Sequence, residues 1–209
     1  MLELLHTAFS LNNNGVISTY WLLPGWLIVG GLLLNRMPRQ YLRVDGRIKR
    51  CWYWFFAVML TLPLILWTTF RGSFGDTYSY ALIFQRTPGN FADLWTYFSE
   101  NKVDYGFYTM VALMKMIGIE SYLWFFFLVA LIQMWCMIYT FRKYAEDFWL
   151  CIFLFVASTD YMSWMYNGIR QFVAVCLVFA GFGLMVRKKH VAFVILVLIA
   201  STFIPELLK

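Results

Sequence analysis

The chain has 209 residues, of which 62% are hydrophobic and 13% are charged, and its mean hydropathy is +0.66. A soluble domain cannot bury this much apolar surface in one core, so the composition excludes an ordinary soluble enzyme and indicates a polytopic membrane protein. The formal net charge of +6 is by itself compatible with nucleic-acid binding. The basic residues, however, gather in loops between apolar runs, where membrane topology explains them, so we expect no nucleic-acid partner.

Five apolar runs are long enough to cross the hydrocarbon core of a bilayer, which takes roughly 20 helical residues. A sixth run, residues 191–203, is too short to cross. We therefore expect an all-α polytopic transmembrane bundle with five full spans and one partial span, forming a single integral membrane domain over residues 1–209. The five full spans are expected at residues 16–34, 51–70, 122–141, 148–165 and 168–186.

The loop after the first span is strongly basic, and short basic stretches follow the third and fifth spans. If the spans alternate in direction, all three stretches lie on one side, and the positive-inside rule makes that side the cytoplasm. The N-terminus is then extracytoplasmic, and its first segment has Glu3 but lacks the basic region of a cleaved signal peptide. The loop after the first span contains Arg36, Arg39, Arg43, Arg47, Lys49 and Arg50.

The longest segment between spans, residues 71–121, falls on the outer side. Two apolar stretches within it, "TYSYALIF" and "DYGFYTMVALMKMIG", are too short to cross a bilayer. Both are expected to be helices that lie in or dip into the outer interface. Pro88, Gly89 and Asn90 are expected to separate them, because these residues favour turns.

The sequence "NGIRQ" opens the fifth span on the outer side. Asn167, Arg170 and Gln171 are spaced i, i+3, i+4 and share one side of a helix. Polar groups at membrane depth usually mark a pathway or site, and a guanidinium at a helix N-terminus suits phosphate or carboxylate oxygens. The amides suit sugar hydroxyls. The alternative is that Arg170 snorkels to the interface or pairs with Asp160 or Asp76.

A second polar group, "RGSFGDTYSY", follows the second span on the same side. Gly72 and Gly75 permit a tight turn, and Asp76 stands where it would cap the helix that follows. In the structural interpretation Arg71 is only an interfacial anchor. In the functional interpretation Arg71 shares an anionic ligand with Arg170, while Asp76 orients an arginine or accepts a proton.

Metal and cofactor motifs do not occur in the sequence. The four cysteines lack CxxC spacing and nearby histidines, so small core-packing residues are expected rather than a metal site or a disulfide. Patterns of the G-x-G-x-x-G, Walker, HExxH and nucleophile-elbow types do not occur either. We therefore expect neither a metal nor a cofactor.

The order "FGDTYSY", "DYGF", "YNGIRQFVAVCLVFAGFGLMVRKK" and "VLIASTF" resembles the EpsG family of bacterial exopolysaccharide membrane proteins, over about residues 71–203. The family is related to the Wzy-type polysaccharide polymerases. The resemblance implies a metal-independent transfer of a growing glycan from an undecaprenyl diphosphate carrier to the next lipid-linked repeat unit. It places this reaction at the outer face of the bacterial plasma membrane, with membrane lipid and other polysaccharide-assembly membrane proteins as expected partners.

Site residues carry over by position, as catalytic groups (Arg71, Asp76 and Arg170) and as substrate-binding groups (Tyr80, Asn167 and Gln171). Two departures stand out. "DYGF" replaces the usual Glu-Pro-Gly-Phe, and Ile204 stands where the family has a histidine. Because family members are longer, the chain is expected to be the N-terminal portion of a longer fold. Two alternatives remain open: a transporter or flippase of lipid-linked glycans, and a non-catalytic subunit or inactive fragment.

Overall fold

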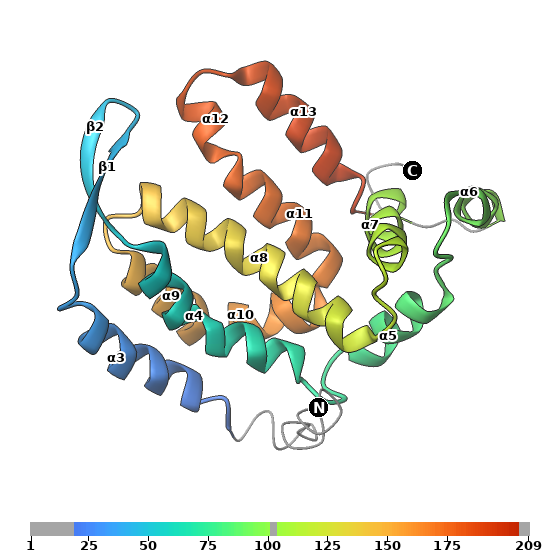
Figure 1. Ribbon diagram of the computed structural model, residues 1–209, viewed down its shortest axis with the longest axis horizontal. Coiled ribbons are helices and arrows are strands. Elements are labelled where there is room, and N and C mark those ends of the chain that lie inside the picture. The colour runs from blue at the N-terminus through green and yellow to red at the C-terminus, as the bar shows by residue number, and fades with distance from the viewer. Residues whose placement is uncertain (1–18, 101–103, 205–209) are drawn as a thin grey trace.

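The computed structural model describes residues 19–100 and 104–204, which form a layered assembly of helices with one β-hairpin (Figure 1). The elements in chain order are α3 (Leu22–Leu34), β1 (Arg39–Val44), β2 (Arg47–Trp52), α4 (Trp54–Thr69), α5 (Thr77–Arg86), α6 (Phe91–Glu100), α7 (Tyr105–Met116), α8 (Tyr122–Tyr144), α9 (Phe148–Ala157), α10 (Asp160–Met162), the π-helical turn η1 (Ser163–Asn167), α11 (Ile169–Ala180), α12 (Phe182–Val186) and α13 (His190–Ser201).

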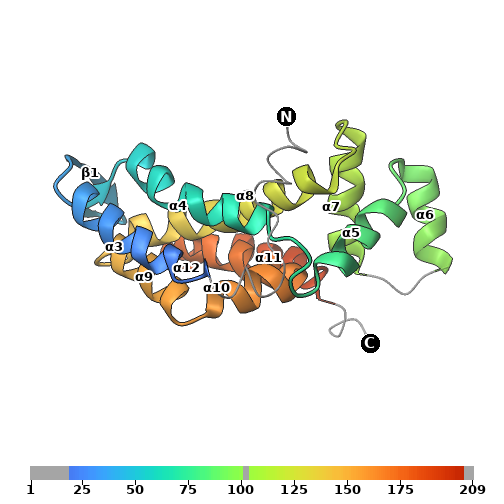
Figure 2. The same cartoon turned by 90° about the horizontal axis from the view of Figure 1, so that it is seen from below.

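Helix α8 is the centre of the assembly. It packs against α4 and α11, while α3 packs on α4 and α9, and α13 packs along α11. Seen from below, the hairpin lies at one end of this layered body, and α5, α6 and α7 gather at the opposite end (Figure 2). The β-hairpin of the basic loop and helices α5, α6 and α7 are therefore at opposite ends of the described structure (Figure 2).

Two helical stretches among the described residues are long and apolar enough to cross a membrane, Tyr122–Tyr144 and Ile169–Val186. Five full spans are not confirmed. Helices α3, α4 and α13 are apolar but shorter, and α4 begins only at Trp54 because Cys51 and Trp52 belong to β2. The start of the first predicted span, residues 16–18, and the N-terminal segment lie outside the described residues.

The fourth predicted span is broken. Helix α9 and the segment Asp160–Asn167 meet at an angle of 73°, so they count as one span only as a bent pair. Thr159 between them has a left-handed backbone, with φ of 68°, and the Ser158 hydroxyl donates to the Asp160 carboxylate. Polar side chains such as these form hydrogen bonds with backbone groups that would otherwise bond within the helix. The π-helical turn that follows is a usual site of a kink.

The β-hairpin corrects the expectation of an all-α fold. It is made by the basic loop after the first predicted span, with Arg39 paired to Trp52 at its root. Asp45 and Gly46 form its two-residue turn and both have positive φ, 49° and 87°. An Asp-Gly pair favours this kind of hairpin turn, and that signal stands in the sequence between Val44 and Arg47.

The described residues between the second and third predicted spans, 71–100 and 104–121, contain three helices, whereas two were predicted. Helices α5 and α7 confirm the two expected from the apolar stretches. Helix α6 was not expected, because its aromatic residues are mixed with polar ones. Pro88, Gly89 and Asn90, predicted to separate α5 directly from α7, lie between α5 and the additional helix α6.

Helices α3 and α9 approach each other closely at a glycine. The Trp149 indole donates from Nε1 to the Leu27 carbonyl at 2.6 Å. A Cβ atom at Gly31 would lie 1.8 Å from that Nε1, whereas a Cβ atom at Gly25, in the same helix, would have nothing within 4 Å. The Trp149 indole therefore occupies the space that a side chain at position 31 would need, so only glycine fits there.

Replacing Gly31 by Ala is expected to destabilise the protein by about 1–3 kcal/mol, because the Trp149 ring must leave its place against α3. The matched change Gly25→Ala, in open space, is expected to stabilise it by about 0.5 kcal/mol through the higher helix propensity of alanine. Thermal unfolding of the two purified variants in detergent measures the difference. Equal melting temperatures would contradict the close approach of α3 and α9.

Candidate functional site

Arg71 follows α4 and is enclosed by the protein, with 2% of its surface exposed. Its Nε donates to the Thr68 carbonyl at 2.7 Å, and its Nη1 donates to the Met165 carbonyl at 2.9 Å. The guanidinium carbon lies 4.4 Å from the centre of the Phe126 ring and 4.9 Å from that of Tyr166. Arg71 therefore joins the end of α4 to η1.

This placement differs from the functional interpretation, in which Arg71 shares an anionic ligand with Arg170. The carbonyls in the last turn of a helix lack helical donors, and in a region without water they need a side-chain donor instead. Arg71 supplies such donors to two backbone segments at once. Its donors point to the main chain, so its geometry is that of a residue that positions the site.

Two tyrosines strengthen the same junction. The Tyr161 hydroxyl donates to the Leu64 carbonyl, and the Tyr166 hydroxyl donates to the Trp67 carbonyl at 3.2 Å. Both tyrosines are fully buried. The bent segment from α10 to η1 is therefore fastened to the last turns of α4, and this fastening sets where α11 begins.

Arg170, in the first turn of α11, forms an ion pair with Asp104. The arginine side chain is 29% exposed and the aspartate side chain 2% exposed. The Tyr80 hydroxyl lies beside Arg170 and donates to the Asn167 carbonyl at 3.0 Å. Tyr108 also lies close enough to interact with the charges of Arg170 and Asp104. Residues from α5, α7 and the start of α11 thus meet around one guanidinium.

Asp104 was not among the residues predicted for the site. The sequence offered Asp160 or Asp76 as partners of Arg170, and the structure pairs it with Asp104 instead. Burial raises the pKa of the Asp104 carboxyl, an effect that the charge and hydrogen bond of Arg170 oppose. The sequence did contain a signal for Asp104. It is the acid of "DYGF" and precedes an apolar helix, just as Asp76 precedes α5.

The remaining predicted residues lie at the surface of this cluster. Asp76 is exposed at the start of α5, and its side chain does not make the capping hydrogen bond that was expected. Gln171 is exposed on α11. Asn167 touches the loop before α5, because a Cβ atom at Gly75 would lie 2.2 Å from its Oδ1. The structure thus brings together Tyr80, Asn167 and Arg170, with Arg71 behind them.

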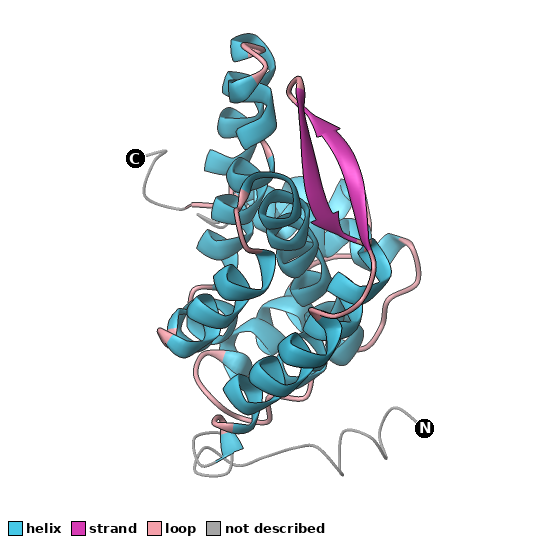
Figure 3. Ribbon diagram, turned by 90° about the vertical axis from the view of Figure 1, so that its left-hand side faces the viewer, coloured by secondary structure: helices cyan, strands magenta, loops and turns pink. Residues whose placement is uncertain are grey.

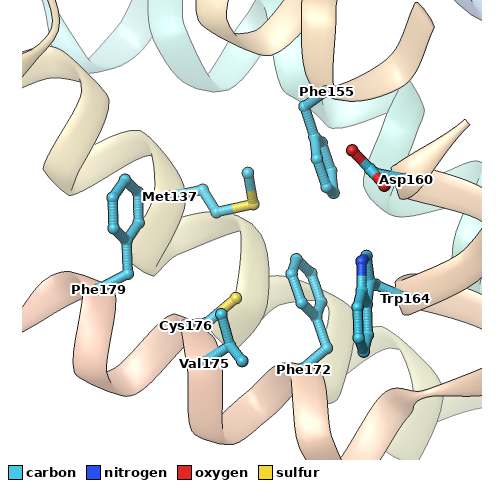
Figure 4. Close-up of a pocket in the computed structure, with 8 residues that line it drawn as sticks. All are labelled: Met137, Phe155, Asp160, Trp164, Phe172, Val175, Cys176 and Phe179. Atoms are coloured by element: carbon cyan, nitrogen blue, oxygen red, sulfur yellow. The ribbon is translucent and has the colours of Figure 1, made fainter. Parts of the chain in front are cut away.

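A separate pocket of about 270 Å³ lies beside the bend that follows α9 (Figure 4). Asp160 carries its only carboxylate, and the other side chains that line it are apolar or aromatic. It contains none of the six predicted site residues. Its lining residues are Met137, Phe155, Asp160, Trp164, Phe172, Val175, Cys176 and Phe179.

Within residues 19–100 and 104–204, no group of three or more His, Cys, Asp and Glu side chains is arranged to hold a metal ion. The charged chemistry of the cluster around Arg170 is that of one guanidinium, one buried carboxylate and neighbouring phenols. Such a set can bind an anion through the arginine and can accept a proton at the carboxylate.

Comparison with known families gives a match over most of the chain. The sequence model of the EpsG family matches residues 53–203, which run from the residue before α4 to just past α13. The matched segment includes Arg71, Asp104 and Arg170, whereas the β-hairpin precedes it. Searches of curated proteins and of solved structures gave no match.

Replacing Arg71 by Met is expected to destabilise the protein by about 2–4 kcal/mol, because the Thr68 and Met165 carbonyls lose their donors inside the protein. Arg71→Lys is expected to recover only part of this loss, since one ammonium does not reproduce the planar fork. The exposed Arg86→Met is the control and is expected to change stability by less than about 0.5 kcal/mol. If Arg71→Met unfolds at the temperature of the control in detergent, the anchoring role of Arg71 is wrong.

Gly75→Ala is expected to destabilise the protein more than Gly118→Ala. Both glycines have positive φ, 60° and 91°, so both substitutions strain the backbone by about 1–2 kcal/mol. Only at Gly75 would the new methyl group collide with the Asn167 amide. Thermal unfolding of both variants measures the additional loss, and similar losses would show that the loop before α5 does not press on Asn167.

Proposed function

The chain belongs to the EpsG family, and from that premise we propose that it catalyses a glycosyl transfer in exopolysaccharide synthesis. The proposed donor is an undecaprenyl-diphosphate-linked glycan, and the acceptor is a hydroxyl of the next lipid-linked repeat unit. The observation that carries the proposal is the partly exposed Arg170, which is paired with a buried carboxylate and lies beside hydroxyl and carbonyl groups.

Arg170 is suited to the diphosphate. An arginine fork binds phosphate oxygens two at a time, and a carboxylate occupies one edge of this fork before substrate arrives. In the proposed cycle the diphosphate takes the place of the Asp104 carboxylate, exchanging one anion for another. As the glycosidic bond breaks, negative charge grows on the leaving diphosphate, and a guanidinium already in place stabilises it.

The proton of the acceptor requires a base. The acceptor oxygen attacks the anomeric carbon, the bond from that carbon to the diphosphate oxygen breaks, and the hydroxyl proton passes to a carboxylate. Asp104 suits this step, because its release from Arg170 leaves a buried carboxylate whose pKa is raised by burial. Asp76, exposed at the start of α5, is the second candidate.

The other predicted residues are proposed to bind the sugar or to position Arg170 and its neighbours. Asn167 and Gln171 offer amides to sugar hydroxyls, and Tyr80 holds the Asn167 carbonyl and contacts Arg170. Arg71 acts through the backbone, because it fixes the Met165 carbonyl two residues before Asn167. We assign it a positioning role in place of a direct contact with the diphosphate.

The proposed orientation puts this cluster outside the cytoplasm of a bacterial cell, with the N-terminus on the same side. It is supported by the separation of the basic hairpin from α5, α6 and α7, which lie at opposite ends (Figure 2). The basic end then faces the cytoplasm. In this orientation the lipid-linked oligosaccharide and other polysaccharide-assembly membrane proteins are the proposed partners.

Arg170→Gln is expected to lower the rate of elongation of lipid-linked oligosaccharide at least about a hundredfold, as losses of charge-stabilising donors do. The assay follows chain length after reconstitution of the whole protein into vesicles. Arg86→Gln, which removes an exposed positive charge from α5, is the matched control and is expected to keep normal elongation.

Three outcomes separate the alternatives. Loss of elongation with Arg170→Gln but not with Arg86→Gln supports the proposal. Transport of the lipid-linked substrate across the vesicle membrane without elongation would instead identify a flippase. Unchanged elongation with Arg170→Gln would refute the role of this arginine.

A further inference from the structure

The β-hairpin has one face turned to the helices and one turned away (Figure 3). Directly paired residues of antiparallel strands share a face. Val44 and Cys51 are buried, and the Lys49 ammonium donates to the Ala145 carbonyl, so their face is the inner one. The register places the other set on the opposite side: Arg39, Tyr41, Arg43, Ile48, Arg50 and Trp52. Trp52 is buried at the root of the hairpin, and the other five residues are here called the outer face.

The outer face combines positive charge with exposed apolar groups. Tyr41 is 71% exposed and Ile48 is 77% exposed, and their cross-strand partners are Arg50 and Arg43. The acid at the tip, Asp45, is already paired with Arg187 at 2.8 Å. Two large apolar side chains among arginines are an unusual surface to leave in water, and they resemble the basic amphipathic surfaces that lie on membranes.

Arg39 adds a more specific observation. Its guanidinium lies over the Trp52 ring, 3.9 Å from its centre, and its Nη2 donates to the Asn35 side chain. Its Nη1 is buried and has no hydrogen-bond partner in the described part of the chain. Burial beside the positive charge of Arg50 lowers the pKa of Arg39, an effect that Asp147 opposes. An unpaired buried donor on a cation calls for an anionic acceptor.

The root of the hairpin places this face at the level of lipid headgroups. Apolar helices α3 and α4 lead into and out of it. Tyr53, which is exposed, and Trp54 follow β2 at once, and aromatic residues at the end of an apolar helix are typical of the membrane interface. Because the hairpin leaves the bundle beside these aromatic residues, lipid phosphate groups are within reach of its outer face if α3 and α4 lie in a bilayer.

We propose that the outer face of the hairpin binds the phosphate groups of anionic glycerophospholipids in the leaflet opposite the glycosyl-transfer site. Tyr41 and Ile48 insert between headgroups, while Arg39, Arg43 and Arg50 bind the phosphates. This binding is separate from the proposed reaction, since the hairpin lies at the other end of the molecule and before the segment that matches the family.

The test uses the whole protein purified in detergent and native mass spectrometry with added phosphatidylglycerol or phosphatidylcholine. The wild type is expected to retain phosphatidylglycerol in preference. Arg39→Gln, Arg43→Gln and Arg50→Gln combined are expected to weaken that retention at least about tenfold, given the usual gain per basic residue at an anionic surface. The matched control combines Lys143→Gln, Lys188→Gln and Lys189→Gln, which removes the same charge elsewhere on the basic end.

Arg39 packs on Trp52, so Arg39→Gln can weaken lipid binding by destabilising the hairpin. A second variant therefore leaves Arg39 unchanged. It combines Arg43→Gln and Arg50→Gln with Tyr41→Ser, all at exposed positions, and is expected to lose the same preference while melting like the wild type in detergent alone. Equal weakening by the lysine control would show diffuse charge attraction and would overturn the proposal. Retention of phosphatidylglycerol by both hairpin variants, or its displacement by millimolar inorganic phosphate, would overturn it as well.

Discussion

The need to satisfy backbone carbonyls away from water determines much of this structure. Helix α4 ends inside the protein, at the buried residues Thr68 and Thr69, and this leaves carbonyls without helical donors. The Arg71 guanidinium donates to one carbonyl from each side of the junction, at Thr68 and at Met165. Enclosed between Phe126 and Tyr166, it also keeps water out. The bent segment can therefore return to α4 and start α11 at a fixed point.

The position at which α11 starts determines which residues surround Arg170. The π-helical turn ends at Asn167, and α11 begins at Ile169, so a guanidinium one residue later lies beside the N-terminal ends of α7 and α11. Asp104 meets it from α7 and Tyr80 meets it from α5. The two arginines thus differ in their surroundings: the enclosed Arg71 binds backbone carbonyls, and the partly exposed Arg170 pairs with a carboxylate.

The sequence was sufficient to predict those helices that depend on a local pattern of apolar residues. Hydropathy located α8 and α11, and apolar stretches located α5 and α7, because burial of an apolar face depends on composition. It was insufficient for Asp104, whose partner is 66 residues away, and for Arg71, whose burial depends on a bend in another segment. The hairpin could have been predicted, because Asp45-Gly46 between alternating residues is a local signal. It was missed because the basic loop was interpreted only as a marker of topology.

At both ends of the short apolar helix α4, an arginine side chain donates to a backbone carbonyl. Arg142 donates from Nε to the Trp52 carbonyl, just before α4, and stacks 4.3 Å from the Trp54 ring centre. Arg71 does the equivalent at the other end, with Thr68. Each cation is shielded by aromatic rings and directed at a carbonyl, so backbone dipoles stabilise its charge. The match is less complete at Arg142, whose Nη2 is buried without a hydrogen-bond partner among the described residues. A buried arginine beside a helix end therefore indicates a stabilised backbone terminus in this fold, whereas Arg170 differs from both in being partly exposed and paired with a carboxylate.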